Sequence, residues 1–376
     1  MSYEILRLLW WAVLGVLLIG VAVMDGFDMG AAILLPFVAR TDMERRIVIN
    51  TVGPVWEGNQ VWLILGGGAV FAAWPPLYSV AFSGFYLAML LLLAALILRP
   101  VGFKFRSKLA DARWRNVWDG ALFVGGLVPA LVFGVAFGNV LQGVPFRFDE
   151  TLRLTYTGSL LGLFNPFALL CGLVSVAMIV THGAIFVAAK TLGPVQARAR
   201  TAGLWAALAT LALFALGGVF AAGLNGYAIG AFAGPAAASN PLNKTVVRVA
   251  GGLFANYRTY RWMIAAPALG LAAPLLTLLA LGRRWLGLAW TASALTLAGV
   301  VGTAGVSLFP FLLPSSLDPR SSLTVWDASS SALTLTVMTI ATAVFLPVIL
   351  AYTAWVYRVL RGPVTEARLK ASSTAY

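Results

Sequence analysis

The chain has 376 residues, of which 60% are hydrophobic and only 10% are charged, and its mean hydropathy is +0.90. Because soluble domains carry about 25% charged residues, this composition excludes a water-soluble protein and indicates an integral membrane protein. The net charge of +13 does not point to nucleic acid, since the basic residues lie mainly at the ends of apolar runs. The single cysteine, Cys171, excludes an internal disulfide and a cysteine-ligated metal cluster.

Nine apolar stretches are long enough to cross a bilayer as helices, since one crossing needs about 20 residues. They lie at about 6–37, 50–73, 78–98, 118–141, 167–189, 202–223, 262–282, 288–312 and 333–357. The first exceeds one crossing and is expected to tilt, or to break near Pro36. The second is interrupted by Gly66, Gly67 and Gly68. The prediction is an all-α membrane protein of about nine transmembrane helices in bundles, forming one domain over residues 1–376.

The loops between these stretches alternate in charge. Most of the 26 basic residues lie in one alternating set, at 40–46, 99–115, 190–200, 283–284 and 358–370. The positive-inside rule makes this set cytoplasmic, so the N-terminus is expected outside and the C-terminus inside. An odd number of crossings agrees with that. The longest segments of the opposite set, at about 142–166, 224–261 and 313–332, are too short for a soluble domain, and the tail after Pro363 is expected to be solvated.

Two carboxylates lie inside the first apolar stretch, at Asp25 and Asp28. Ionised groups at this depth cost about 2.5–3.5 kcal/mol on insertion scales, so they need a partner, a proton or a polar path. Three residues apart on a helix, they share one face, and like charges so close resist joint ionisation. They are therefore candidates for a proton relay. The alternative is structural: they anchor a subunit interface, or cap a helix that breaks at Gly26 or Gly30.

A third carboxylate, Glu57, lies in the sequence WEGNQVW at the start of the second stretch, where Trp56 and Trp62 flank Asn59 and Gln60. Asn and Gln side chains hydrogen-bond between membrane helices. An aromatic belt with a capping glutamate explains the tryptophans, but it explains the polar residues less well. Glu57 is therefore a further proton-route candidate, and Trp56, Asn59 and Gln60 are candidates for shaping the path.

His182 is the only histidine, and one imidazole ligates at most one haem. A buried, hydrogen-bonded imidazole in the fifth stretch is favoured over a haem ligand. Arg99 and Pro100 close the third stretch and open the most basic loop. Such a loop sets orientation and contacts anionic lipid, but Arg99 could instead pair with a carboxylate at a helix end. The sequence has no zinc-site, CxxCH or Walker pattern.

Ordered motifs along nearly the whole chain resemble subunit II of the cytochrome bd-type quinol (ubiquinol) oxidase family. They are DGFDMG (25–30), ERRIVIN (44–50), WEGNQVWLI (56–64), FAAWP (71–75), AFSGFYLAM (81–89), LRPVGF (98–103), RSKL (106–109), RWRNVWD (113–119), GVAFGNVLQGVPF (134–146), SNPLNK (239–244), FPFLLPSS (309–316), LTVWDASSS (323–331) and LTLTVMT (333–339). So many matches in the same order are highly specific.

The resemblance implies a bacterial inner-membrane complex with a larger subunit I, which holds two b-type haems and one d-type haem. Subunit I oxidises quinol and reduces oxygen to water, while subunit II carries no haem and no metal and packs beside it as a pseudo-symmetric partner. Some relatives hold a structural quinone in subunit II, and a small single-helix accessory subunit is a further possible partner. Quinol, membrane lipids and subunit I are the expected partners, and nucleic acid is not.

The family draws its chemical protons from the cytoplasm, which generates a membrane potential, and polar residues between the two subunits are proposed to carry them. On matching positions, the proton-route candidates are Asp25, Asp28 and Glu57. Many relatives have Asp where this chain has Glu57, so its carboxylate is displaced by about one bond. Two other functions compete: a purely structural subunit with no proton role, and a proton-coupled permease, although the paired broken helices of many transporters are not evident.

Overall fold

Long apolar helices make up most of the computed structural model, which describes residues 1–371. The long helices are α1 (Tyr3–Met24), α2 (Gly26–Val38), α4 (Trp56–Ala73), α6 (Tyr86–Phe105), α7 (Ala112–Gln142), α8 (Pro166–Lys190), α9 (Gly193–Ala222), α11 (Ala265–Gly282), α12 (Leu286–Leu308) and α13 (Ala332–Val359). Shorter helical segments are α3 (Asp42–Val52), α5 (Pro75–Gly84), η1 (Arg106–Lys108), η2 (Leu161–Leu163), η3 (Gly252–Phe254), α10 (Ala255–Thr259), η4 (Arg261–Ile264), η5 (Pro319–Ser321) and α14 (Glu366–Ala371). This arrangement confirms the predicted all-α membrane fold.

Polar caps fix where several helices begin. The side chains of Ser2, Asn165 and Ser331 each accept a hydrogen bond from the backbone N–H three residues later, which satisfies a donor that the first turn cannot pair. The starts of α8 and α13 agree with the predicted stretches to within one residue. Short polar side chains at the ends of apolar runs therefore mark the membrane helices well.

Eight spans among the described residues are long and apolar enough to cross a membrane, with α1 and α2 counted together. A ninth is the pair α4 and α5, which is bent by 120°. The bend follows from Pro75, because a proline disfavours helical geometry at the residue before it and so ends α4 at Ala73. The second predicted stretch, whose glycines made it uncertain, is the one with this irregular geometry.

Several predicted boundaries are corrected. The long first stretch breaks at Asp25, and Pro36 lies inside α2. The third stretch was expected to start at residue 78, but residues 78–84 belong to α5 and the returning helix α6 begins at Tyr86. The helix α12, which corresponds to the eighth predicted stretch, ends at Leu308 rather than at residue 312. These errors share a cause. The stretches were drawn from runs of apolar residues, and such a run can continue through a point where the helix breaks or turns.

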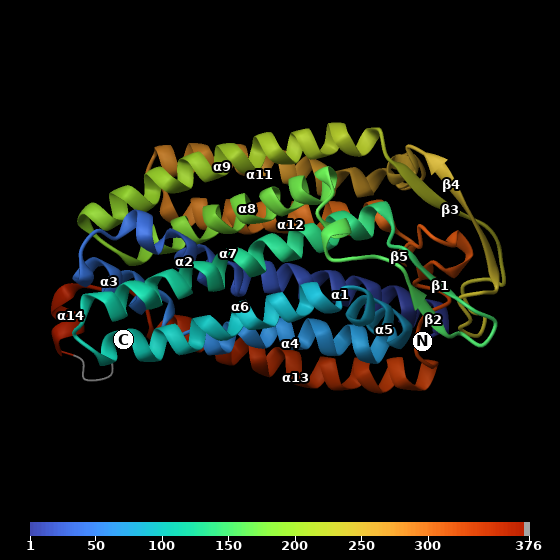
Figure 1. Cartoon of the computed structure of the whole chain (residues 1–376), viewed down its shortest axis with the longest axis horizontal. Coiled ribbons are helices and arrows are strands. Elements are labelled where there is room, and N and C mark those ends of the chain that lie inside the picture. Colours follow the sequence, from blue (N-terminus) through green and yellow to red (C-terminus); the bar gives the residue numbers. More distant parts are fainter. Residues whose placement is uncertain (372–376) are drawn as a thin grey trace.

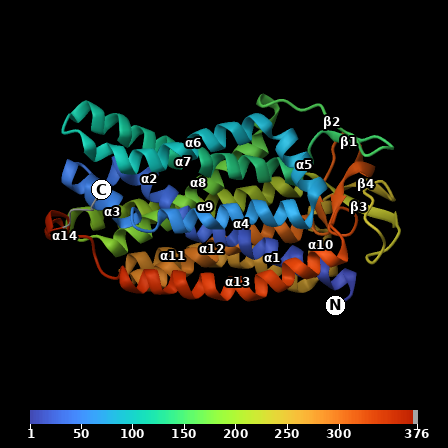
Figure 2. The same ribbon diagram turned by 90° about the horizontal axis from the view of Figure 1, so that it is seen from below.

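The long helices form two groups that meet along α8 (Figures 1 and 2). The helices α8, α9, α11 and α12 pack together, while α7 packs with both α2 and α6, and α1 packs with α4. The helix α8 joins the groups because it contacts both α2 and α7, and it is the most deeply buried span. The helix α13 lies at the side, against α1 and α4, and buries little of its surface.

Three small antiparallel sheets lie at the same end as the N-terminus (Figure 1). The paired strands are β1 (Phe146–Phe148) with β2 (Leu154–Tyr156), β3 (Asn225–Phe232) with β4 (Lys244–Ala250), and β5 (Phe311–Leu313) with β6 (Leu323–Thr324). Most of these strands lie in the three segments that sequence analysis predicted only as loops, but β5 begins inside the predicted eighth stretch, 288–312. The buried guanidinium of Arg7 on α1 donates to the carbonyls of Pro235 and Ala237, at 2.6 and 3.0 Å, and so ties the β3–β4 connection to the bundle.

The opposite end carries α3 and α14 (Figure 1). Glu44 in the capping box of α3 accepts a hydrogen bond from Arg198 of α9 at 2.5 Å, which lowers the pKa of the Glu44 carboxyl below its usual value. The tail was expected to be solvated after Pro363, but α14 forms there and buries Leu369. Residues 372–376, the end of that predicted tail and of the predicted 1–376 domain, lie outside the described residues.

Glycines let α2 and α8 approach closely. A Cβ atom added to Gly183 would lie 2.6 Å from the Cα atom of Gly30, and one added to Gly30 would overlap the carbonyl oxygen of Ile179. Backbone on both sides leaves no flexible side chain to yield. Small residues at such crossings are how membrane helices pack tightly, and here they hold the two helix groups together.

We therefore expect Gly30→Ala to lower the free energy of unfolding by about 1–3 kcal/mol, the usual effect of overpacking. The matched control is Gly218→Ala on α9, where an added Cβ meets nothing within 4 Å. The thermal midpoint of the purified protein in detergent is the measurement. Equal midpoints for the two variants would contradict the close approach of α2 and α8.

Candidate functional site

Asp25 lies where the first apolar span breaks. It is the single residue between α1 and α2, and its side chain is fully buried. Its own N–H still bonds to the carbonyl of Val21, and its carbonyl accepts from Met29, at 3.0 and 3.1 Å. The span therefore continues across the break but loses regular helical bonds within it. The Asp25 side chain makes no capping hydrogen bond to α2, so the capping role considered for it does not occur.

Arg99 of α6 neutralises Asp25. Its two terminal nitrogens donate to the two carboxylate oxygens at 2.9 and 3.0 Å, which is the bidentate geometry that suits a guanidinium and a carboxylate. The side chains are 1% and 0% exposed. The pair is thus a buried ion pair shielded from water. Its two charges cancel, so the pair adds no net charge to the interior of the bundle.

Asp28 belongs to a different set of contacts. Its Oδ2 accepts from the Asn59 amide of α4 at 2.9 Å, and the Oδ1 of Asn59 accepts from the Tyr357 hydroxyl of α13 at 2.8 Å. The Oδ1 of Asp28 is buried and has no hydrogen-bond partner among the described residues. Within residues 1–371 no cation is bonded to Asp28, and one of its oxygens remains available.

The remaining predicted residues lie around the start of α4. Trp56 is buried against Phe103, with ring centroids 5.8 Å apart. Gln60 is half-buried. Glu57 is on the surface of the chain: its side chain is 68% exposed and lies 3.7 Å from the amino group of Lys104. The structure thus brings Asp25, Asp28 and Asn59 into the interior and leaves Glu57 outside their hydrogen-bonded network.

Sequence analysis missed Tyr357 and left the role of Arg99 open. The interior position of Arg99 was signalled by its place at the end of an apolar stretch, but nothing in the sequence chose its partner. Tyr357 carried no usable signal, since a tyrosine near the end of a membrane helix ordinarily reads as an interfacial anchor. Both residues reach the site from helices distant in sequence.

His182 is buried, as expected, and both of its ring nitrogens are engaged. One lies 3.1 Å from the Val23 carbonyl and the other 2.7 Å from the Ser293 hydroxyl. The ring also stacks on Trp290, with centroids 4.1 Å apart. In this arrangement neither nitrogen is free to bind haem iron. The chain's one imidazole therefore does not fit an axial haem ligand.

A cluster of charges at the α3 end is held together by ion pairs. Arg106 bonds to Asp119 at 2.5 Å and to Asp42 at 3.0 Å, Arg45 bonds to Asp119 at 2.8 Å, and Arg115 bonds to Asp42 at 2.7 Å. These contacts join α3, η1 and α7. The cluster is a clamp between helix ends rather than a site for chemistry.

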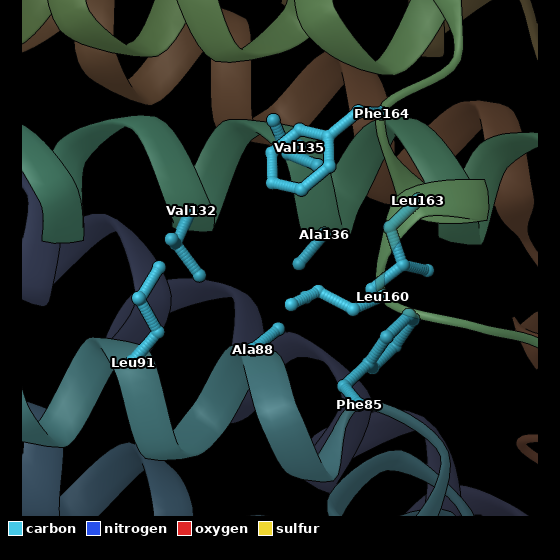
Figure 3. A pocket seen from close by; sticks show the side chains of 9 residues that line it. All are labelled: Phe85, Ala88, Leu91, Val132, Val135, Ala136, Leu160, Leu163 and Phe164. Carbon is cyan, nitrogen blue, oxygen red and sulfur yellow. The ribbon is translucent and has the colours of Figure 1, made fainter.

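An apolar pocket opens between α6, α7 and the η2 segment (Figure 3). Phe85, Ala88, Val132, Leu160 and Phe164 are among its lining side chains, and no polar group faces it. It lies near the start of α6, whereas Arg99 lies near the other end of that helix. The pocket is therefore separate from the buried carboxylates and offers no group for proton transfer.

Comparison with known sequences places the chain in one family along most of its length. The family model for cytochrome bd terminal oxidase subunit II matches residues 6–360. The chain is 54% identical to cytochrome bd-I ubiquinol oxidase subunit 2 of Escherichia coli (strain K12) over 366 residues, which cover 97% of each chain. It is 33% identical to cytochrome bd ubiquinol oxidase subunit 2 of Bacillus subtilis (strain 168), over 95% of this chain and 96% of the relative.

The fold is also shared with a solved structure. A chain of the bd oxidase from Geobacillus thermodenitrificans superimposes with a TM-score of 0.68 at 18% identity, covering 94% of this chain and 98% of that one. At that identity the likeness shows the arrangement of helices alone. The assignment rests on the sequence matches, which span both helix groups. The chain belongs to the cytochrome bd terminal oxidase subunit II family.

Proposed function

We propose that this chain works as the subunit without haem in a quinol:oxygen oxidoreductase and helps to deliver protons to the oxygen-reducing site. As a family member it is a multi-pass protein of the inner membrane and part of an oxidoreductase complex. The curated relatives named above are ubiquinol oxidases, and ubiquinol is the proposed substrate of this complex. The haem-bearing subunit I, with two b-type haems and one d-type haem, is the proposed partner and catalytic site. Because the chain belongs to an oxidase subunit family, a proton-coupled permease is no longer a competing function.

The proposed orientation has the N-terminus outside and the α3 end in the cytoplasm. It is supported by the basic loops, which connect helix ends at the end of the molecule that carries α3 and α14 (Figure 1). Under this orientation the small sheets cap the outer face. Protons taken from the cytoplasm would then reach the start of α4 first, and the single membrane domain would move charge across part of the bilayer.

Asp28 carries the proposal. A carboxylate that is buried without a bonded cation is costly when ionised, and binding a proton removes that cost. Asp25 is less suited to this exchange, because its two oxygens are both bonded to Arg99. Asp28 has one oxygen free and the other held by Asn59. We therefore assign proton exchange to Asp28, and charge compensation at the site to Asp25 and Arg99.

Glu57 is the proposed entry group. It lies in the first turn of α4 on an exposed surface that is otherwise largely apolar, and Lys104 of α6 is beside it. Charged side chains on such a surface indicate a protein neighbour or water rather than lipid. This supports subunit I as the neighbour of the surface formed by α4 and α6. Glu57, half-buried Gln60 and buried Asn59 then lead from that surface toward Asp28.

A structural role without proton transfer is the second candidate, and the Asp25–Arg99 pair favours it. A buried, bidentate ion pair between α6 and the α1–α2 break would lock three segments together whether or not protons pass. The two functions differ in what happens when the carboxyl group is neutralised without changing its size. Only the proton route requires Asp28 to titrate.

We expect Asp28→Asn to lower the kcat of quinol-driven oxygen uptake by about 10- to 100-fold, the usual scale for losing a proton-transfer group. The haem absorption spectrum of the complex should stay unchanged, because the amide keeps the shape of the site. Full turnover in a complex with normal spectra would leave Asp28 with the structural role alone.

Glu57→Gln tests the entry group separately. Proton entry should slow, and oxygen uptake with it, whereas Glu57→Asp should keep most of the activity because a carboxylate remains. The pair of variants separates charge from shape, since Gln matches the length of Glu and Asp does not. Equal rates for the Gln and Asp variants would remove Glu57 from the route.

The ion pair makes a stability prediction. Asp25→Asn or Arg99→Gln alone should destabilise the protein by about 3–5 kcal/mol, because each leaves an uncompensated buried charge. The double variant should recover part of that loss. A double-mutant cycle on the thermal stability of the purified complex measures the coupling, and additive losses would show that the two groups do not compensate each other.

A further inference from the structure

The break at Asp25 ends α1 at Met24, so the carbonyls of its last turn, that of Val23 among them, have no partner inside α1. The hydrogen bonds across the break include Asp25 N–H to the Val21 carbonyl, at 3.0 Å, and Met29 N–H to the Asp25 carbonyl, at 3.1 Å. A carbonyl left unpaired within a membrane span costs free energy, so a donor from another helix stabilises such a break.

His182 supplies that donor from α8. Its Nε2 lies 3.1 Å from the Val23 carbonyl oxygen, and because a carbonyl only accepts, Nε2 must carry the proton. In the neutral imidazole this leaves Nδ1 to accept from the Ser293 hydroxyl of α12, at 2.7 Å, while the Trp290 carbonyl competes for the same hydroxyl proton at 2.9 Å. The stack on Trp290 fixes the plane of the ring. The imidazole is thus held from α12 and aimed at the break.

We infer that His182 is a positioning residue for Asp25: by bonding to the Val23 carbonyl, it stabilises the break that turns the Asp25 carboxylate onto Arg99. If α1 and α2 instead continued as one regular helix, residues 25 and 28 would rotate together relative to α6 and α4. The role ascribed to His182 therefore differs from haem ligation and from simple packing. Its kinetic consequence rests on the proposed proton route, but its structural consequence does not.

The test compares His182→Leu, which removes the donor, with His182→Gln, whose amide keeps both a donor and an acceptor. Thr181→Val is the packing control, because Thr181 is the buried neighbour on α8 and bonds toward Ala177 and Thr210 rather than toward the break. All three are purified as assembled complexes in lipid nanodiscs. Hydrogen–deuterium exchange of the segment 21–29 and steady-state oxygen uptake are measured on each.

We expect His182→Leu to speed exchange in 21–29 and to lower kcat roughly three- to tenfold, the scale of one lost hydrogen bond. The KM for quinol should not change. Gln should restore both readouts, and Thr181→Val should change neither. Unchanged exchange in His182→Leu, or no recovery with Gln, would overturn the inference.

Two mixed results are also decisive. In the first, His182→Leu exchanges faster but keeps a normal kcat, while the separate Asp28→Asn variant turns over slowly. This result overturns the inference, because the break then does not control the site. In the second, His182→Leu exchanges faster in 21–29, His182→Gln restores normal exchange, and both His182→Leu and Asp28→Asn keep a normal kcat. This result upholds the positioning role of His182 and overturns the proton route instead.

Discussion

Charge compensation in a dry interior is the constraint on which the centre of this protein depends. Two carboxylates and one guanidinium lie together in a largely apolar bundle, where an unpaired ion costs several kcal/mol. Arg99 can bond fully to only one carboxylate, and it bonds to Asp25 through both terminal nitrogens. Asp28 instead accepts a hydrogen bond from the neutral side-chain amide of Asn59. The difference between two aspartates only one turn apart therefore comes from where one arginine lies.

The helix break and the close helix packing serve that arrangement together. The break frees Asp25 to face α6, while the glycine contact between Gly30 and Gly183 holds α2 against α8. The same helix α8 carries His182, which bonds to the broken segment. A wider separation of α2 from α8 would lengthen that bond and open the interior to water. Tight packing is thus a condition for the electrostatics as well as for stability.

Most spans could be predicted because length, apolarity and flanking charge are local properties. The prediction failed at the α4–α5 bend and at the three small sheets, where the chain turns without a change that a window of apolar residues records. The carboxylates stood out because charges are rare at such depth. Their partners did not, since Arg99 is 74 positions from Asp25 and Tyr357 is 298 positions from Asn59. Pairings of that kind depend on how the helices pack, which the sequence patterns do not encode.

The least buried helix contributes to the most buried site. Within this chain α13 packs mainly against α1 and α4 and exposes most of its surface, yet its Tyr357 hydroxyl orients the amide that faces Asp28. Because the amide oxygen accepts from that hydroxyl, the amide nitrogen must point toward the carboxylate. The peripheral helix and the hydrogen bonding of Asp28 are in this way physically linked.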